Sequence, residues 1–168
     1  MKKHESCLHQ LCTTQIDKFL AEAEQTECDY LLRFLLLTGL RVSEAIALMW
    51  SDIDFVKGTI TVNRRQIGTQ FEPPKGGSRV IIPSPFVMRL LWDMKTEQEK
   101  SRFDNNREPQ SFSEWANTSV FTTVQGKPFD YHDISKAAKN VFSSIGLDKF
   151  NIYNLRETYI LRSKSIIV

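Results

Sequence analysis

Apolar positions recur at helical spacing along most of the chain and alternate with polar ones only in a short central stretch. Spacings of three and four residues predict helices over 14–23, 27–38, 42–50, 85–94, 131–145 and from 153 onward. Alternating β-branched residues and extended pieces between turns predict strands over 59–63, 68–71 and 79–82. The pattern therefore indicates a mainly α protein with a small three-stranded antiparallel β-sheet, an α+β fold.

Individual residues predict where several of these elements begin and end. The helix over 27–38 is apolar on almost every side, so it should be central to the core, and Gly39 is a natural left-handed stop. Thr14 and Asp130 are predicted N-caps. The helix after Pro85 could extend to about residue 102, and the polar stretch that follows it is predicted to be a long loop. A short strand is predicted over 120–122.

Composition narrows the class of protein. The chain has 168 residues, 41% of them apolar and 11% aromatic, which fits one globular domain of average size rather than a disordered chain. No apolar run approaches the roughly 20 residues needed to cross a bilayer, and the polar N-terminus lacks a signal peptide. The three cysteines lie within the first 28 positions. We expect free or buried thiols, no metal site, no cofactor, no membrane partner and a cytoplasmic location.

Charge is distributed unevenly along the chain. Residues 1–56 carry 5 basic and 9 acidic side chains (net −4), whereas residues 57–102 carry 9 and 4 (net +5). A basic segment of this kind is what a nucleic-acid-binding protein needs to neutralise phosphates. An ordinary solvated face carries similar charge, so charge alone does not decide between the two interpretations.

Three basic residues occupy special backbone positions. Arg41 follows Gly39 in a joint between two helices, Lys75 lies on a Pro/Gly-rich hairpin, and Arg156 lies near the start of the last helix. Arginines at helix starts and joints suit a phosphate, because the neighbouring free N–H groups also favour anions. Glu44 follows Arg41 by about one helical turn, and the simplest interpretation is an internal salt bridge between them.

As a set, these residues resemble the catalytic domain of tyrosine recombinases, the phage and transposon integrase family. Residues 38–54 are similar to the family's first arginine box, and residues 74–83 to the hairpin that carries its lysine. Residues 153–158, Tyr-Asn-Leu-Arg-Glu-Thr, resemble the second box, usually His-x-Leu-Arg-His-Thr. The resemblance implies an N-terminal tail or linker remnant over 1–12 and an integrase catalytic domain over 13–168.

The resemblance implies site-specific DNA recombination or integration. In the family a tyrosine attacks the scissile phosphate and forms a 3′-phosphotyrosine, in a tetramer on DNA that needs neither metal nor ATP. The implied partner is double-stranded DNA. The expected assembly is a homotetramer on DNA, or a monomer for a chain of this length. Within the basic segment, we hypothesise that Arg64, Arg65 and Arg79 contact the DNA backbone.

The resemblance also implies roles for single residues. Arg41 and Arg156 would bind the non-bridging oxygens, because fixed guanidinium groups stabilise a phosphorane more than the ground state. Lys75 would protonate the leaving 5′ oxygen, and Glu44 would orient the site. Tyr153 replaces the usual histidine; its hydroxyl can hydrogen-bond a phosphate oxygen, but with a reference pKa near about 10 it is a poor general base at neutral pH.

In the family, the nucleophilic tyrosine lies in a further segment after the second arginine box. This chain ends ten residues after Thr158. Tyr30 and Tyr131 are interpreted as packing residues, and Tyr159, on the helix of Arg156, is not favoured as a substitute nucleophile. We therefore expect a C-terminally truncated catalytic domain whose phosphate-binding site is assembled without its nucleophile. Whether the chain is an enzyme stays open at this point.

Two alternatives remain open from the sequence. The chain could be a catalytically inactive DNA-binding relic or an interfering fragment of an integrase. It could also be an unrelated helical interaction domain with no role in nucleic-acid binding. Salt-sensitive DNA binding that falls when Arg41 or Arg156 is replaced by alanine would separate the recombinase interpretations from the unrelated one.

Overall fold

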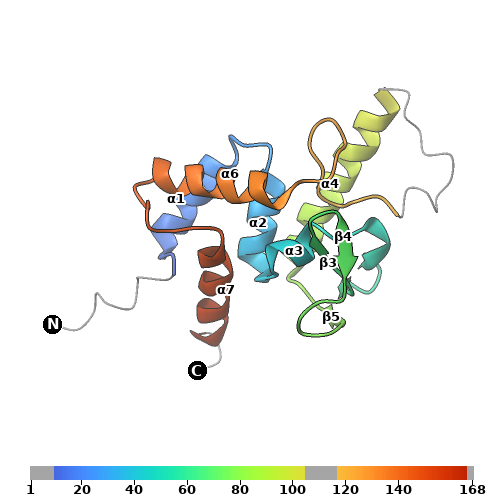
Figure 1. Ribbon diagram of the computed structural model, residues 1–168, viewed down its shortest axis with the longest axis horizontal. Helices are drawn as coiled ribbons and strands as arrows, with labels where there is room; N and C mark the ends of the chain where they lie inside the picture. The colour runs from blue at the N-terminus through green and yellow to red at the C-terminus, as the bar shows by residue number, and fades with distance from the viewer. Residues whose placement is uncertain (1–9, 105–116, 166–168) are drawn as a thin grey trace. The chain divides into compact units, whose positions relative to one another are not determined.

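The computed structural model describes residues 10–104 and 117–165, which belong to two compact units. The first unit comprises residues 1–42 and 123–168, and the second comprises residues 43–122. Helices of the first unit are α1 (Thr13–Ala23), α2 (Asp29–Thr38), α6 (Tyr131–Ser144) and α7 (Tyr153–Ser165) (Figure 1). The second unit holds the strands and helix α4 (Pro85–Asp104). The prediction of a mainly α protein with a small antiparallel sheet is confirmed.

In the first unit, helix α2 packs against both α1 and α7, and α1 packs against α6. The α1–α6 contact centres on Phe19 and Phe142, whose ring centroids lie 4.8 Å apart. Helix α2 is buried along most of its length, as its nearly continuous apolar sequence predicts. Further buried apolar side chains of this unit are Leu31, Leu32, Leu35, Ile134, Ala138, Ile152 and Leu155.

Two of the predicted helix signals in the first unit are confirmed and one is wrong. Gly39 ends α2 with a φ of 62°, and the Asp130 carboxylate accepts a hydrogen bond from the His132 N–H at 2.7 Å. Helix α1 begins at Thr13 rather than after a cap at Thr14. The cap lies earlier because the Gln15 amide oxygen accepts a hydrogen bond from the Cys12 N–H at 2.9 Å.

In the second unit, strands β1 (Ile53–Asp54), β2 (Thr59–Val62) and β5 (Arg79–Ile81) form an antiparallel sheet in the order β1-β2-β5. Ile60 of β2 lies opposite both Ile53 and Ile81 and is fully buried. Strand β2 alternates buried and half-buried positions, the pattern of a sheet with one face on the core.

The membership of the sheet differs from the sequence-based prediction. Strands β3 (Arg65–Ile67) and β4 (Gln70–Glu72) form a separate two-stranded hairpin, and β1 supplies the third strand of the larger sheet. The turn between β3 and β4 contains Gly68 with a φ of 56°, a conformation that glycine adopts without strain. The two short strands on either side of this turn therefore pair with each other.

The predicted helix over 42–50 is wrong in length. Helix α3 (Val42–Ala45) is a single turn, and the 3-10 helix η1 (Trp50–Asp52) follows after an extended Met49. The backbone leaves the helix because it pairs with a distant segment: the Val120 N–H donates to the Leu48 carbonyl at 2.9 Å. The predicted strand over 120–122 is wrong: the nearby isolated bridge joins Met49 to Ser119, and of residues 120–122 only Thr122 takes part in a β-bridge.

The sequence predicted a helix over 85–94 that could extend to about residue 102, and the longer extent is confirmed by helix α4. It begins after Ser84, continues through Gln98 and ends at Asp104. The Gln98 side chain accepts a hydrogen bond from the Trp50 indole N–H at 3.0 Å and donates one to the Val120 carbonyl at 2.8 Å. The predicted long loop falls mainly on residues 105–116, which lie outside the described residues. Of the helices in residues 10–104 and 117–165, none is long and apolar enough to cross a membrane.

Candidate phosphate-binding site

Two arginines of the first unit are brought to the end of helix α2. Arg156, on the first turns of α7, donates a hydrogen bond from Nη1 to the backbone carbonyl of Gly39. Arg41, two residues after Gly39, is exposed. The carbonyl end of a helix carries partial negative charge, which favours a guanidinium there. The fold therefore places the two arginines of the predicted phosphate site at one backbone turn.

Gly39 also lies against the Tyr159 side chain of helix α7. A Cβ atom at this position would lie 2.8 Å from Cγ of the Tyr159 ring, well inside normal contact distance. Tyr159 and Arg156 are three residues apart on α7, so both reach the same helix face. Only glycine permits this approach together with the left-handed backbone conformation.

The side chains of two asparagines bind backbone N–H groups at the start of α7. The Asn154 amide oxygen accepts a hydrogen bond from the Asn151 N–H at 2.8 Å, and the Asn151 amide oxygen accepts one from the Tyr153 N–H at 2.9 Å. Deeper in the unit, the buried Thr158 hydroxyl accepts a hydrogen bond from the Leu11 N–H at 2.9 Å. These contacts set the position of α7 and therefore of Arg156. Leu11 lies within the range predicted as a tail, and the boundary at residue 12 stays a prediction.

Glu157, the residue after Arg156, has a local partner. Its carboxylate accepts a hydrogen bond from the Asn154 side-chain amide at 3.3 Å. The contact ties the carboxylate to Asn154, whose amide oxygen binds the Asn151 N–H at the start of α7.

Tyr153 is joined to a residue that sequence reasoning assigned to packing. The Tyr153 side chain is 62% exposed, and its hydroxyl lies 2.8 Å from the hydroxyl of Tyr131, the first residue of α6. This hydrogen bond, together with partial burial, raises the pKa of Tyr131 to about 12. No local pattern could have found the pair, because 22 residues separate the two tyrosines and the contact depends on how the starts of α6 and α7 meet.

Lys75 lies in the second unit, on an exposed turn. The Gly77 N–H donates to the Pro74 carbonyl at 3.0 Å and closes the turn around Lys75. Within residues 10–104 and 117–165, the Lys75 ammonium makes no hydrogen bond or ion pair. Its predicted place near a hairpin tip is corrected, because the tip of the β3–β4 hairpin lies at Gly68 and Lys75 lies in the link from β4 to β5.

Glu44 and Arg79 form a two-pronged ion pair in the second unit. Arg79 of β5 donates from Nη1 to Oε1 of Glu44 at 3.2 Å and from Nη2 to Oε2 at 2.7 Å. Glu44 is fully buried, whereas the Arg79 side chain is 31% exposed. A buried carboxylate needs such a partner. The interpretation of Glu44 as a partner of nearby Arg41 missed this contact, because Arg79 is 35 residues away in sequence.

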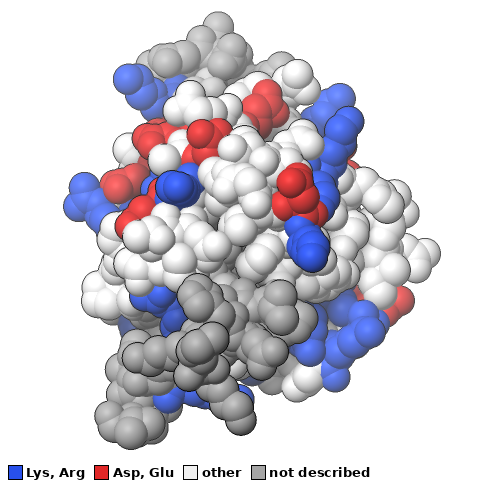
Figure 2. Space-filling view, turned by 90° about the vertical axis from the view of Figure 1, so that its left-hand side faces the viewer, with Lys and Arg blue, Asp and Glu red and all other residues white. Residues whose placement is uncertain are grey.

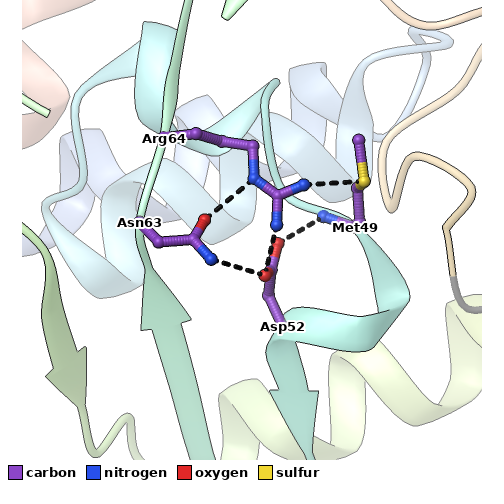
Figure 3. Close-up of polar contacts among 4 residues, drawn as sticks. All are labelled: Met49, Asp52, Asn63 and Arg64. Atoms are coloured by element: carbon purple, nitrogen blue, oxygen red, sulfur yellow. Dashed lines mark hydrogen bonds and ion pairs between the residues drawn. The ribbon is translucent and has the colours of Figure 1, made fainter. Parts of the chain in front are cut away.

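Arg64 is held in a cluster of four residues (Figure 3). Its Nη2 lies 2.6 Å from Oδ1 of the buried Asp52, its Nε donates to the Asn63 amide oxygen at 2.8 Å, and its Nη1 lies 2.7 Å from the Met49 sulfur. Asp52 also accepts a hydrogen bond from the Met49 N–H at 2.9 Å. Asp52 lies within the stretch that resembles the first arginine box, and sequence reasoning gave it no role.

Arg65 also has an internal partner: its guanidinium lies 2.8 Å from the Glu72 carboxylate across the β3–β4 hairpin and donates to the Pro73 carbonyl at 3.1 Å. All three arginines hypothesised to contact DNA, Arg64, Arg65 and Arg79, therefore bind carboxylates of the fold. Their contact with DNA stays a prediction. On the face shown in Figure 2, basic side chains lie beside acidic ones.

Over the described part of the chain, no group of three or more His, Cys, Asp or Glu side chains could hold a metal ion. The cysteines described there are an exposed Cys12 and a buried Cys28, both with free thiols. Cys7 lies outside the described residues.

The comparisons with known proteins agree with the family that the sequence motifs indicate. The phage integrase family model matches residues 9–162. The prophage integrase IntR of Escherichia coli strain K12 is 27% identical over 152 residues, which make up 83% of this chain and 37% of IntR. The chain therefore spans well under half the length of this curated relative.

Solved structures show the same fold. The Tn1549 transposon integrase in complex with transposon right end DNA matches with a TM-score of 0.71 at 20% identity, over 99% of this chain and 56% of that one. The XerH site-specific recombinase bound to its difH substrate matches with a TM-score of 0.63 at 20% identity, over 94% and 43%. The XerA recombinase matches with a TM-score of 0.60 at 21% identity, over 92% and 50%.

Proposed function

Because this chain belongs to the phage integrase family, we propose that it carries the phosphate-binding part of a site-specific DNA recombinase. The reaction proposed is cleavage and rejoining of DNA strands through a 3′-phosphotyrosine, and the partner is double-stranded DNA. The observation that carries the proposal is the hydrogen bond from Arg156 to the Gly39 carbonyl, which holds one arginine beside the backbone turn that bears Arg41.

The charge that develops during phosphoryl transfer explains why two arginines are needed. A pentacoordinate phosphorane carries more negative charge on its non-bridging oxygens than the starting diester does. Guanidinium groups fixed in advance stabilise that charge without reorganising during the reaction. Arg156 meets this requirement through its anchor on α2, and Arg41 projects from a helix joint whose backbone is fixed by Gly39. Both residues are proposed to bind the same phosphate.

Lys75 is the proposed acid that protonates the leaving 5′ oxygen. Its exposed turn is suited to deliver an ammonium group to DNA, since the side chain has no internal partner among the described residues. Two residues after the turn, Arg79 begins β5 and is bound to the buried Glu44. Glu44 thus supports the strand that leads out of the turn, which gives it a positioning role in the proposed site.

The attacking tyrosine is proposed to lie outside these 168 residues, either in a longer product or in a partner chain. The Tyr159 ring packs against Gly39, and the hydroxyls of Tyr131 and Tyr153 bind each other. These contacts give three of the four tyrosines roles in packing or hydrogen bonding. Tyr30 lies on α2.

A suicide half-site assay tests this assignment. The chain is incubated with nicked duplexes of several candidate attachment sequences, and a denaturing gel is examined for a covalent adduct. We expect the duplexes to bind without forming an adduct. An adduct from this chain alone would assign attack to one of its own tyrosines and contradict the proposal. Failure to bind any duplex would overturn the phosphate-binding assignment itself.

A further inference from the structure

The hydrogen bond between the hydroxyls of Tyr131 and Tyr153 joins the starts of α6 and α7. The proposed function gives this hydrogen bond no role toward DNA. Tyr153 is the first residue of α7 and lies three residues before Arg156. Residues three apart on a helix are neighbours on its surface, so the Tyr153 side chain and the Arg156 guanidinium share one face of α7. Tyr131, from a different helix, reaches the hydroxyl of Tyr153 at 2.8 Å.

We propose that Tyr131 is a positioning residue that donates a hydrogen bond to the Tyr153 hydroxyl and thereby directs the Tyr153 proton to a DNA phosphate oxygen. This inference rests on the proposed function of the same site. It gives Tyr131 a role in phosphate recognition rather than in packing.

The direction of the hydrogen bond follows from simple counting. Each phenol has one proton to donate, and a phosphate oxygen can only accept. If Tyr153 donates its proton to phosphate, its oxygen can still accept one from Tyr131. The two hydrogen bonds then run in the same direction, from Tyr131 to Tyr153 to phosphate, and each strengthens the other. If Tyr153 instead donated its proton to the Tyr131 oxygen, it would have no proton left to donate to the phosphate.

The surroundings of the two side chains agree with this order. Tyr153 is 62% exposed, so it can reach a ligand, and Tyr131 is half-buried. The hydrogen bond with Tyr153 raises the pKa of Tyr131 to about 12, as expected for a phenol that keeps its proton.

A double-mutant cycle on DNA affinity tests the inference. Tyr131→Phe, Tyr153→Phe and the double variant are compared with the parent chain, using a fluorescent duplex at fixed salt. We expect each single change to weaken binding by about fivefold, the scale of one hydrogen bond to a charged group at a half-exposed site. The double variant should bind no more weakly than Tyr153→Phe alone, because Tyr131 acts only through Tyr153.

A matched control and a spectroscopic measurement separate positioning from structure. Tyr159→Phe removes a hydroxyl from the same helix and should leave affinity unchanged. In an ultraviolet titration of the tyrosines without DNA, Tyr153→Phe should shift the pKa of Tyr131 from about 12 toward its ordinary value. If the pKa of Tyr131 does not change on this substitution, the inference is overturned, because the hydroxyl pair would not exist in solution.

The binding measurements show separately whether this inference or the proposed function fails. Binding that depends on Arg41 and Arg156 but not on Tyr131 would overturn the inference alone. Additive effects of the two tyrosine substitutions would also overturn it, since Tyr131 would then act independently of Tyr153. A parent chain that binds no duplex would overturn the proposed function and this inference with it.

Discussion

Arg156 and Gly39 lie 117 positions apart in the chain, and the guanidinium of the first donates a hydrogen bond to the backbone carbonyl of the second. The contact joins the start of α7 to the end of α2, within one compact unit. It has two consequences. It stabilises the packing of the two helices, and it holds a cation beside the turn that carries Arg41.

Replacing Arg156 should therefore affect both stability and DNA binding, and the two effects can be separated. Arg156→Lys keeps the charge but cannot reproduce the planar donor geometry, so we expect DNA affinity to fall by about tenfold. The free energy of unfolding should fall by only about 1 kcal/mol, the scale of one hydrogen bond. Duplex binding and urea denaturation measure the two effects. Equal DNA affinity for lysine and arginine would argue against fixed guanidinium recognition.

Gly39 should tolerate no side chain. Gly39→Ala would combine a left-handed backbone with a contact against the Tyr159 ring. Gly58 provides the matched control, because its φ of 65° is almost the same and nothing lies within 4 Å of an added Cβ. Gly58→Ala should cost about 1 kcal/mol from the backbone alone. Gly39→Ala should cost about 2 kcal/mol more, from the steric contact.

The same substitution has a rescue test. Tyr159→Ala added to Gly39→Ala removes the ring that the new Cβ would meet. The double variant should lose less stability than the sum of the two single variants, as measured by urea denaturation. Strict additivity would show that the contact between Gly39 and Tyr159 does not limit the position.

The Glu44–Arg79 ion pair should stabilise the second unit because one partner is fully buried. Arg79→Ala removes the two-pronged partner of a buried carboxylate and should cost about 3 kcal/mol of unfolding free energy. Arg65→Ala is the matched control, since the Glu72 side chain is 44% exposed and water can replace the arginine. Its cost should be at most about 1 kcal/mol. Equal costs for the two variants would contradict the importance of burial.

Cys28 should be far less reactive than Cys12. Burial raises the pKa of Cys28 to about 11, whereas a hydrogen bond from the Thr14 hydroxyl lowers the pKa of the exposed Cys12 thiol. Only the thiolate is nucleophilic, so alkylation at pH 8 followed by peptide mass spectrometry should label Cys12 at least about tenfold faster. Comparable labelling of the folded protein at both positions would contradict the burial of Cys28.

The raised pKa of Cys28 also predicts a pH dependence of stability. Between the ordinary pKa of about 9 and the folded value of about 11, the unfolded chain binds fewer protons at this position than the folded chain. Stability contributed by the neutral thiol is therefore present below pH 9 and falls as the pH rises to 11. Cys28→Ala should make the fall over this interval smaller in urea denaturation.

The sequence correctly predicted helix ends that are determined by residues close to them in the chain. The stop at Gly39 and the cap at Asp130 were readable because backbone conformation and side-chain chemistry act within one or two residues. The helix over 42–50 could not be bounded in this way, because pairing of Leu48 with Val120 ends it. Tertiary pairing outweighs helix propensity at such positions.

The same distinction applies to the candidate site. Arg41, Lys75 and Arg156 could be picked out because a glycine stop, a Pro/Gly turn and a helix start mark their positions in the sequence. The partners Arg79 for Glu44 and Asp52 for Arg64 could not be read, since they come from distant elements that meet only in the folded unit. The roles of all these residues toward DNA remain predictions.

The central claim, that Arg41 and Arg156 bind a DNA phosphate, is tested most directly by the salt dependence of duplex binding. Affinity is measured across salt concentrations for the parent chain, Arg41→Ala, Arg156→Ala and Arg89→Ala. Arg89 is an exposed α4 arginine paired with Asp93 and serves as the control. We expect the slope of log affinity against log salt to fall by about 1 for each of the first two variants and to stay unchanged for the third. Slopes that are the same for all four proteins would contradict the claim.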